Sequence, residues 1–484
     1  IHYRTATFIP PKGFPTTQFD MVVAEDIGLH KFDILSQRGL SKIQDALALA
    51  RINNRNIELF DIRDLQRFKE DEKVKELLRN GKTIGCFYVE SPAMRMLLTK
   101  LRVDTYLGLV AASSIIRPGV SNSGMMREYI LRFTDPSKRS DAHPVMLEIM
   151  PDTFGVMVYQ EDVIKVAHYF AGLTLGEADV LRRGMSGKFR SRDEFKRVEN
   201  QYFENCKERG YTDELASEIW RQIESFAGYA FAKGHSASYA VESYQSLYLK
   251  AHYPLEYMVA TINNFGGFYK TEFYVHEARK NGGIIEEPCV QLGDYPTVIV
   301  NKKIYLGFVL LYGLDQNVGI QITRERQDGG LFKDLVDFIT RVPAGIEQVS
   351  LLIRIGAFRF TGIAKQTLLW EAHHILKGRT AKDLVTEVPS LFKGATQKSH
   401  DYKVPLLTQT KPEEAFDQIE LLGFPLCNPF ELADEPLVNG TTAKELSSKL
   451  GHFIIAYGYL VTVKNTKTAK GERMNFATFI DQNG

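Results

Sequence analysis

The chain has 484 residues, more than one hydrophobic core usually organises, so we expect several domains of about 100–200 residues each. Its 60 Lys and Arg residues nearly balance its 59 Asp and Glu residues, and the net charge of +1 means that any nucleic-acid surface has to be local. The four cysteines lie far apart without a Cys-x-x-Cys pair, which argues against a zinc site or a disulfide framework and predicts a reducing, cytoplasmic compartment. No apolar run approaches about 18 residues and no signal-peptide segment opens the chain, so we expect neither membrane insertion nor Sec-type export.

Both ends of the sequence have the character of cut ends. The chain begins at Ile1 rather than Met, and it finishes with an alternating, strand-like pattern followed by turn-forming residues 481–484. We therefore expect a fragment of a longer protein.

The first predicted elements lead from short strands into helices. Residues 17–40 contain two short apolar-alternating segments and run into a helix from Ser41, a pattern typical of the edge of an α/β unit. From there to about Glu287, apolar residues recur at i, i+3, i+4 spacing, which predicts a large helical domain.

The second half of the chain predicts smaller units. Residues 297–311 alternate like a pair of strands, and short helices separated by glycine turns follow as a separate module. The polar segment of residues 377–407 indicates a connector that serves as a hinge or a docking segment. Residues 452–481 predict a β-hairpin that opens a barrel or a sandwich.

The most informative segment is residues 226–254, where a cation-bearing loop precedes a long helix that stops at Pro254. Lys233 and His235 come directly before Ser236, where we expect the helix to begin. Small and hydroxyl residues at a helix start leave backbone N–H groups for phosphate oxygens, so the segment indicates an anion site. The alternative is an ordinary capped helix whose tyrosines lie in the core.

A concentrated basic segment spans residues 182–197. Seven cations against two acids give it a local charge of +5, and glycines after the first two arginines would let the backbone approach a phosphate. The alternative is a solvated helix face. The seven cations are Arg182, Arg183, Lys188, Arg190, Arg192, Lys196 and Arg197.

Six blocks of sequence, in this order, resemble one known family. They are KFD (31–33), IGCFYVESPAMRMLLTKL (84–101), SSIIRPGVSNSGMMREYI (113–130), TFGVMVYQEDV (153–163), GEADVLRRGMSGK (176–188) and FAKGHSASYAVESYQSLYLKAHYP (231–254). Together they are similar to the bacterial DNA polymerase III alpha subunit, the replicative C-family DNA polymerase. The resemblance spans nearly the whole chain.

The resemblance implies a mainly α, multi-domain (α+β) protein. Its helical polymerase fingers would be joined to a palm remnant, a helix-hairpin-helix module and a partial β-barrel of the OB-fold type. The implied domains are the end of the palm (1–45), the fingers (46–290), the helix-hairpin-helix region (291–378), a connector with a possible clamp-docking segment (379–444) and the start of the OB-fold (445–484).

The chemistry that the resemblance implies is template-directed nucleotidyl transfer, in which two Mg²⁺ ions are held by three aspartates. Asp33, within the Lys-Phe-Asp block, corresponds to one of these metal ligands, and Lys31 would lie beside the triphosphate or the metal. The chain has no Asp-x-Asp pair, and Asp61 and Asp64 lie three apart in a charged, helical setting, so they are not substitutes. We therefore expect the fragment alone to be inactive.

The resemblance also implies where nucleotide and DNA bind. Arg182 and Arg183, together with Lys233 and His235, would contact the phosphates of the incoming deoxynucleoside triphosphate. Within the basic segment, DNA contacts are expected from Lys188, Arg190 and Arg192. The implied partners are primer–template DNA, deoxynucleoside triphosphates and, by analogy, the sliding clamp and other replisome subunits.

Several alternatives stay open from the sequence. The turn at residues 312–319, YGLDQNVG, lacks the extra glycine expected of a DNA-contacting hairpin, so it either contacts DNA or has a structural role. The segment closest to a clamp-binding motif is residues 402–407. An error-prone repair paralogue of the same family, or a non-enzymatic DNA-binding or replisome-interaction module, would share these features.

Overall fold

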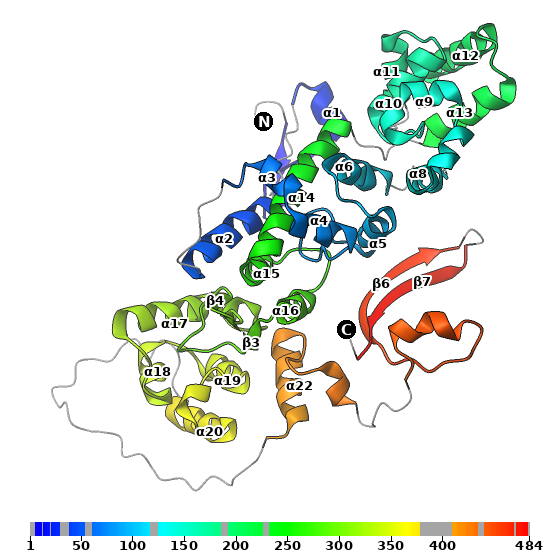
Figure 1. The fold of residues 1–484 in the computed structure, drawn as a ribbon. Coiled ribbons are helices and arrows are strands. Elements are labelled where there is room, and N and C mark those ends of the chain that lie inside the picture. Colours follow the sequence, from blue (N-terminus) through cyan, green and yellow to red (C-terminus); the bar gives the residue numbers. More distant parts are fainter. Residues whose placement is uncertain are drawn as a thin grey trace.

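The computed structural model of the chain describes residues 5–11, 13–19, 21–29, 38–53, 61–116, 124–184, 192–225, 232–377, 409–433, 440–468 and 471–482. Within these residues helices predominate, and the strands form small sheets of two, three and two strands. Figure 1 shows the helices gathered in groups along the chain, with a long strand pair near the C-terminal end. The predicted mainly helical class with minor β-structure is confirmed.

The first described elements are a strand pair and a short helix. β1 (Thr7–Phe8) pairs antiparallel with β2 (Thr16–Thr17), and α1 spans Met21–Asp26. The prediction of apolar-alternating, strand-like segments is wrong at residues 21–26, because these residues form the helix α1. Gly28, at φ 80°, ends the helix in the left-handed conformation, and the Leu29 N–H donates to the Ala24 carbonyl over 2.9 Å.

Eight helices build a central lobe, which we define as residues 38–53, 61–116 and 232–280. The lobe combines α6 and the helices before it with α14 and the helices after it, so its two halves are distant in sequence. The helices are α2 (Arg38–Asn53), α3 (Leu65–Glu70), α4 (Glu72–Arg79), α5 (Pro92–Leu101), α6 (Tyr106–Ile115), α14 (Lys233–His252), α15 (Pro254–Asn263) and α16 (Thr271–Lys280).

Local caps explain several boundaries in the central lobe. Asp71 ends α3 and caps α4, because its carboxylate accepts the N–H of Val74 over 3.0 Å. Ser91 caps α5 in the same way, with Pro92 at the first helical position, where no N–H is needed.

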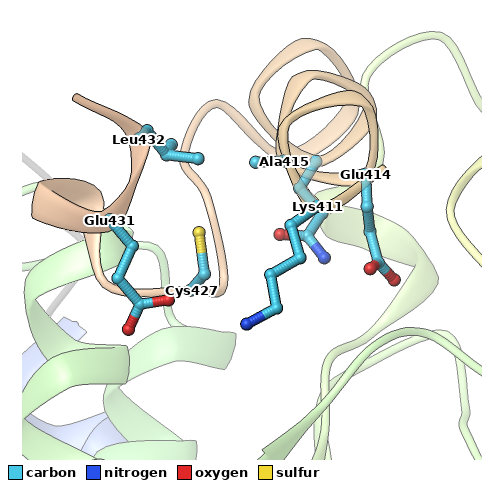
Figure 2. Close-up of a pocket in the computed structure, with 7 residues that line it drawn as sticks. Lys411, Glu414, Ala415, Cys427, Glu431 and Leu432 are labelled. Carbon is cyan, nitrogen blue, oxygen red and sulfur yellow. The ribbon is translucent and has the colours of Figure 1, made fainter. Parts of the chain in front are cut away.

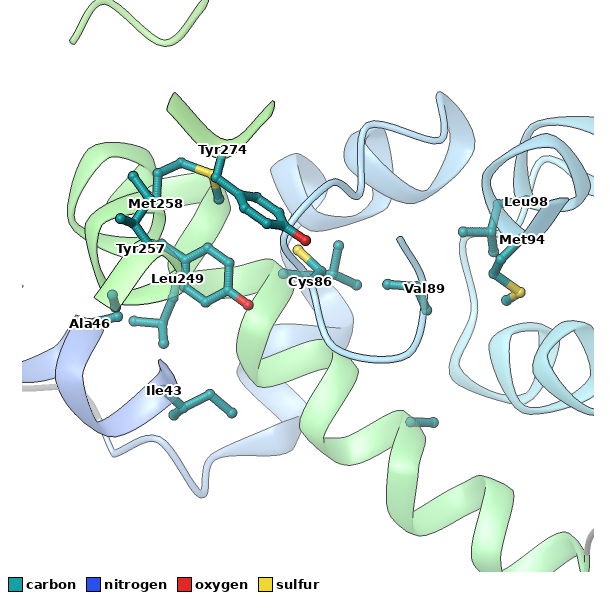
Figure 3. Close-up of a cluster of buried hydrophobic side chains, with 14 of the residues drawn as sticks. Ile43, Ala46, Cys86, Val89, Met94, Leu98, Leu249, Tyr257, Met258 and Tyr274 are labelled. Atoms are coloured by element: carbon teal, nitrogen blue, oxygen red, sulfur yellow. The ribbon is translucent and has the colours of Figure 1, made fainter. Parts of the chain in front are cut away.

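The core of the central lobe lies where α14 and α15 meet α2 and the loop before α5. Figure 3 shows Ile43 of α2 and Leu249 of α14 close to Tyr257 of α15. The Tyr257 ring is fully buried, and its hydroxyl donates to the Gly85 carbonyl over 2.9 Å, so the loop before α5 is fixed to α15. Burial of several large side chains, each worth about 1.5–3 kcal/mol, holds the two halves of the lobe together.

A second group of helices forms a distal lobe, residues 124–184 and 192–225, which carries the expected fingers arginines Arg182 and Arg183. Its α-helices are α8 (Met125–Thr134), α9 (Pro144–Ile149), α10 (Gln160–Lys165), α11 (Leu175–Gly184), α12 (Arg192–Glu208) and α13 (Asp213–Ser225). Its short 3₁₀ and π segments are η1 (Pro136–Asp141), η2 (Pro151–Thr153) and η3 (Val166–Phe170).

The π segment η3 is stabilised by a distant arginine. Arg209, just after α12, donates to the carbonyls of Tyr169 and Phe170 over 2.7 and 3.1 Å, which satisfies groups that the irregular helix leaves unbonded. Beside it, the Phe170 and Tyr211 rings stack with their centroids 4.3 Å apart. These contacts tie η3 to the end of α12.

A three-stranded sheet opens the next module. β3 (Ile284–Glu286) pairs parallel with β5 (Lys303–Tyr305), and β4 (Val298–Val300) pairs antiparallel with β5. The strand pair predicted within residues 297–311 is confirmed, and η4 (Phe308–Leu310) follows it. The helices of the module are α17 (Gln316–Gly329), α18 (Leu335–Arg341), α19 (Ile346–Arg354) and α20 (Lys365–Leu376), with η5 (Arg359–Thr361) between the last two.

Part of the predicted connector is a helix that docks on this module. α22 (Lys411–Leu422) is held by Arg354, whose Nε lies 2.8 Å from Asp417, and by Gln418, whose amide donates to Glu287 over 2.7 Å. With η6 (Pro429–Leu432), α22 borders a cavity of about 470 Å³ that Figure 2 shows between Lys411, Glu431 and their neighbours. The segment closest to a clamp-binding motif, residues 402–407, lies outside the described residues.

The last described elements are η7 (Ala443–Lys449) and the predicted β-hairpin. β6 (Tyr459–Lys467) pairs antiparallel with β7 (Arg473–Ile480), and the Tyr459 hydroxyl donates to Glu272 of α16 over 3.1 Å. The hairpin is thus confirmed and touches the central lobe. The OB-fold itself stays a prediction, as do the domain boundaries.

Candidate nucleotide site

The start of α14 differs from the predicted one. The helix begins at Lys233, so Lys233 and His235 lie in its first turn rather than in a preceding loop. The helix is capped from outside its own segment, because the Lys233 N–H donates to both carboxylate oxygens of Glu161 over 2.9 and 3.1 Å. Ala232 has no side-chain acceptor, and Glu161 of α10 takes that role.

The backbone groups expected to meet phosphate have internal partners. The N–H groups of His235 and Ser236 both donate to the Ala232 carbonyl, over 3.1 and 3.2 Å. The Ser236 hydroxyl lies 2.8 Å from that of Ser114, and both side chains are buried. The small residues of this turn therefore allow α6 to pack closely against α14.

The Lys233 ammonium is held by the distal lobe. Its Nζ lies 3.2 Å from a carboxylate oxygen of Asp152 in η2 and 5.4 Å from the centre of the Tyr159 ring. The Lys233 side chain remains 40% exposed, so this ion pair contributes at most about 1 kcal/mol. A stronger anion could therefore replace it.

His235 belongs to a half-buried aromatic cluster with Tyr239, Phe87 and Tyr88. The His235 and Tyr239 ring centroids are 4.2 Å apart, and Tyr239 meets Phe87 and Tyr88 edge-on at 5.2 and 4.9 Å. Tyr88 has φ 67°, a strained conformation for a residue with a Cβ. The sequence reasoning missed Phe87 and Tyr88 as neighbours of His235, although both lie inside one of the blocks that carry the resemblance.

Arg182 and Arg183 share one carboxylate near the end of α11. Arg182 lies 2.8 Å and Arg183 2.9 Å from different oxygens of Asp179. The side chain of Arg183 is 60% exposed and that of Arg182 33%, so both guanidinium groups are accessible to a ligand at the surface. The structure pairs these arginines with each other through Asp179.

The remaining predicted site residues lie outside the described part of the chain. Lys31 and Asp33, with Lys188 and Arg190, fall in segments that the structure does not describe. Arg192 is the first residue of α12, but the structure does not describe its side chain.

The described residues do not form a metal centre. Among them, no group of three or more His, Cys, Asp or Glu side chains is arranged to hold a metal ion. Asp61 bonds Arg63 over 2.9 Å, which lowers the pKa of its carboxyl group, and Asp64 caps α3 through the N–H of Arg67. Asp61 and Asp64 thus bond local partners just before α3 and at its N-cap, and the helical setting predicted for them is wrong.

The turn before α17 is shorter than predicted. Asp315 caps the helix through the N–H of Asn317 over 2.7 Å, so Gln316 to Gly319 are already helical. The Gln348 amide of α19 accepts the Asp315 N–H over 2.6 Å and donates to the Gly313 carbonyl over 2.9 Å. These bonds support a structural role for the turn.

Comparison with known proteins identifies two segments. The sequence model of the bacterial DNA polymerase III alpha subunit finger domain matches residues 39–210, from the second residue of α2 to just after α12. A helix-hairpin-helix motif matches residues 282–368, from β3 into α20. No helix in the described ranges has the length and apolar character needed to cross a membrane.

Curated relatives extend the match. The DNA polymerase III subunit alpha of Staphylococcus aureus strain MRSA252 is 36% identical over 368 residues, which cover 75% of this chain and 34% of the relative. The DNA polymerase III subunit alpha of Staphylococcus epidermidis strain RP62A is 32% identical over 486 aligned positions, which cover 96% of this chain and 43% of the relative. The chain therefore spans less than half the length of the curated relatives it matches. From its finger-domain match and these relatives, the chain belongs to the bacterial DNA polymerase III alpha subunit family.

Proposed function

We propose that this chain supplies the fingers of a template-directed DNA polymerase that adds deoxynucleotides to a primer 3′ end. The observation that carries the proposal is the finger-domain match over residues 39–210, which includes the paired arginines of α11. Arg182 and Arg183 are accessible and already bind an oxyanion, the Asp179 carboxylate, in a geometry that also suits phosphate.

Lys233 and His235 extend the proposed phosphate site to the first turn of α14. A fixed ammonium beside a helix N-terminus favours negative charge, and such preorganised groups stabilise the charge that develops on pyrophosphate. Lys233 would bind and orient the triphosphate. His235, whose ring packs against Tyr239, would contact the phosphates from the same turn.

The metal part of the proposal rests on Asp33 and Lys31 and on the family alone. Mg²⁺ would supply charge neutralisation at the reacting phosphate. The described residues do not by themselves fit a metal ion, so we assign no step of the reaction to one.

The proposed partners are primer–template DNA and deoxynucleoside triphosphates, with the clamp and other replisome subunits by analogy. Lys188, Arg190 and Arg192 would bind the DNA backbone, and the hairpin β6–β7 would open an OB-fold. The four cysteines are free thiols, which supports a reducing compartment, and we propose the cytoplasm.

The nucleotide site is tested by replacing both arginines, Arg182→Ala with Arg183→Ala, in the full-length polymerase that carries this chain. We expect the nucleotide KM to rise or kcat to fall, with kcat/KM lowered about 10- to 1000-fold, while DNA affinity changes little. Steady-state primer extension at varied nucleotide concentration measures both constants.

Arg221→Ala is the matched control for the arginine pair. Arg221 lies on α13 of the same lobe and pairs with Glu218 over 2.7 Å, so its loss removes a comparable surface ion pair outside the proposed site. Unchanged kcat and KM in the double variant, equal to those of the control, would remove the arginines from the nucleotide site.

We also propose that the 484-residue chain alone does not extend a primer. The family uses three metal-binding aspartates, and only one of them has a counterpart in this chain, Asp33. The measurement is primer extension by the purified chain with Mg²⁺ and all four deoxynucleotides. Sustained extension by the chain alone would show that this assignment of the metal ligands is wrong.

A further inference from the structure

Two carboxylates of the distal lobe hold the first residue of α14. Glu161 accepts the Lys233 N–H over 2.9 and 3.1 Å, and Asp152 lies 3.2 Å from the Lys233 Nζ. Glu161 and Asp152 stand 72 and 81 residues before Lys233, in α10 and η2. We call these three residues the carboxylate clasp, which joins the distal lobe to the central lobe.

The clasp uses the groups that the proposed function gives to phosphate. Carboxylate and phosphate oxygens are acceptors of the same kind for an ammonium group and for the N–H groups of a helix start. The Lys233 backbone N–H and its ammonium each bond a carboxylate of this chain in the structure. A phosphate that takes either of these positions on Lys233 has to displace a carboxylate, and one that binds the exposed side of the ammonium meets the negative charge of Asp152.

The same arrangement recurs on the neighbouring helix. α10, which carries Glu161, packs against α11, where Asp179 occupies both Arg182 and Arg183. Three of the four residues expected at the phosphates are thus paired with carboxylates of the distal lobe. The side-chain ion pairs are partly exposed, and each such ion pair changes an equilibrium by only about two- to fivefold.

We propose that Glu161 and Asp152 compete with the nucleotide's phosphates for Lys233, so that phosphate binding releases the distal lobe from the start of α14. This inference rests on the proposed function, because it takes Lys233 as a phosphate ligand. A triphosphate carries several charges where each carboxylate carries one, so it displaces the clasp at the expense of part of its own binding affinity. Glu161 and Asp152 are then positioning residues that lower nucleotide affinity and hold the lobes together before binding.

The first test measures binding of inorganic triphosphate to the 484-residue chain by titration calorimetry. The variants are Glu161→Gln, Asp152→Asn and the two combined, which keep the shape of each side chain and remove its charge. The double variant should bind triphosphate about three- to tenfold more tightly than the unchanged chain. Glu148→Gln is the matched control, since Glu148 is an exposed acid on α9 of the same lobe.

The outcomes separate this inference from the proposed function. If the double variant binds no more tightly than the Glu148→Gln control, while Lys233→Ala loses binding, the competition is wrong and the phosphate role of Lys233 stands. If Lys233→Ala binds triphosphate like the unchanged chain, Lys233 is no phosphate ligand, and both proposals fail at this residue.

A second measurement reports the clasp without nucleotide. Fluorescence energy transfer between dyes on Lys73→Cys in the central lobe and Lys207→Cys in the distal lobe, with Cys427→Ser to prevent extra labelling, follows the separation of the lobes. The double variant alone, and the unchanged clasp with triphosphate, should both shift the transfer efficiency in the same direction. If neither the double variant nor the addition of triphosphate alters the transfer efficiency, the claim that the carboxylate clasp holds the lobes together is wrong.

Discussion

At the scale of single residues, Glu242 shows a charge that the fold disfavours. Its side chain lies on α14 and is 8% exposed, and its Oε1 has no hydrogen-bond partner among the described residues. A Cβ on Gly39 of α2 would lie 1.9 Å from that oxygen, so the carboxyl group fills the gap between the two helices. Burial raises the pKa of Glu242 to about 7, although Lys42 opposes the shift.

This raised pKa predicts a pH-dependent effect of Glu242→Gln. The folded state binds the proton more tightly than the unfolded state, so the stabilising contribution is complete below about pH 4.5 and is lost as the pH rises through about 7. Since Gln stays neutral, the variant should be more stable than the unchanged chain by about 2–3 kcal/mol at pH 8 and nearly equal to it at pH 4.5. Urea unfolding of both proteins at the two pH values measures the difference.

Glu76→Gln serves as the control for Glu242→Gln. Glu76 is an exposed carboxylate on α4 of the same lobe, so its replacement removes one acid without opening or relieving a buried site. A stability difference for Glu242→Gln that stays constant from pH 4.5 to 8, like that of the control, would contradict the burial argument.

The sequence identified the cations of the candidate site but not their partners. Lys233 and the two arginines stand out as charges beside glycines, and the structure finds them accessible. The sequence did not predict Asp152 and Glu161 as partners of Lys233. They lie in another lobe, and their local sequence pattern does not indicate a contact with α14. Contacts across 70 or more residues are set by the tertiary fold, which a single sequence does not display.

At the scale of elements, periodicity predicted the long helices and the strand pairs, and the boundaries depended on caps. α14 starts three residues earlier than Ser236 because Glu161 caps it from a distance. α17 starts within the expected turn because Asp315 caps it locally through the N–H of Asn317. Glycine content alone is therefore a poor guide to where these helices begin.

Helix α22 was hidden for a related reason. It lies within residues 379–444, which the resemblance implied to be a connector. Thr410 and Glu413 nevertheless form a capping box, in which the Thr410 N–H donates to Glu413 over 2.7 Å, and Arg354 anchors the helix to α19 through Asp417. The capping pattern was legible in the sequence, whereas the docking on Arg354 was not.

At the scale of the whole molecule, a net charge of +1 means that the proposed DNA binding has to use local surfaces. The distal lobe carries the basic segment, and its helix α12 continues with Lys196, which pairs with Glu199 over 2.8 Å and is 67% exposed. Part of the segment is thus a solvated face with its own acid partner. The cations expected to contact DNA precede Lys196 in the sequence and are Lys188, Arg190 and Arg192.

This division of charge predicts the salt dependence of DNA binding by the chain. Replacement of Lys188, Arg190 and Arg192 by Ala should weaken binding of a primer–template duplex for all sequences alike, because phosphates and not bases are contacted. Each lost phosphate contact lowers the slope of log Kobs against log salt concentration by about 0.9, so the slope should fall by about 2.7. Fluorescence anisotropy titrations between about 50 and 200 mM salt measure it.

The matched control removes three cations from the central lobe, with Lys73, Lys100 and Lys280 each replaced by Ala. These side chains are exposed and the net charge changes by the same amount, so long-range attraction falls equally in both variants. If Lys188, Arg190 and Arg192 contact phosphates directly, only their replacement lowers the slope of log Kobs against log salt concentration. An equal loss in both would mean that the chain attracts DNA through its overall charge, and the basic segment would then be the solvated face that its composition also allows.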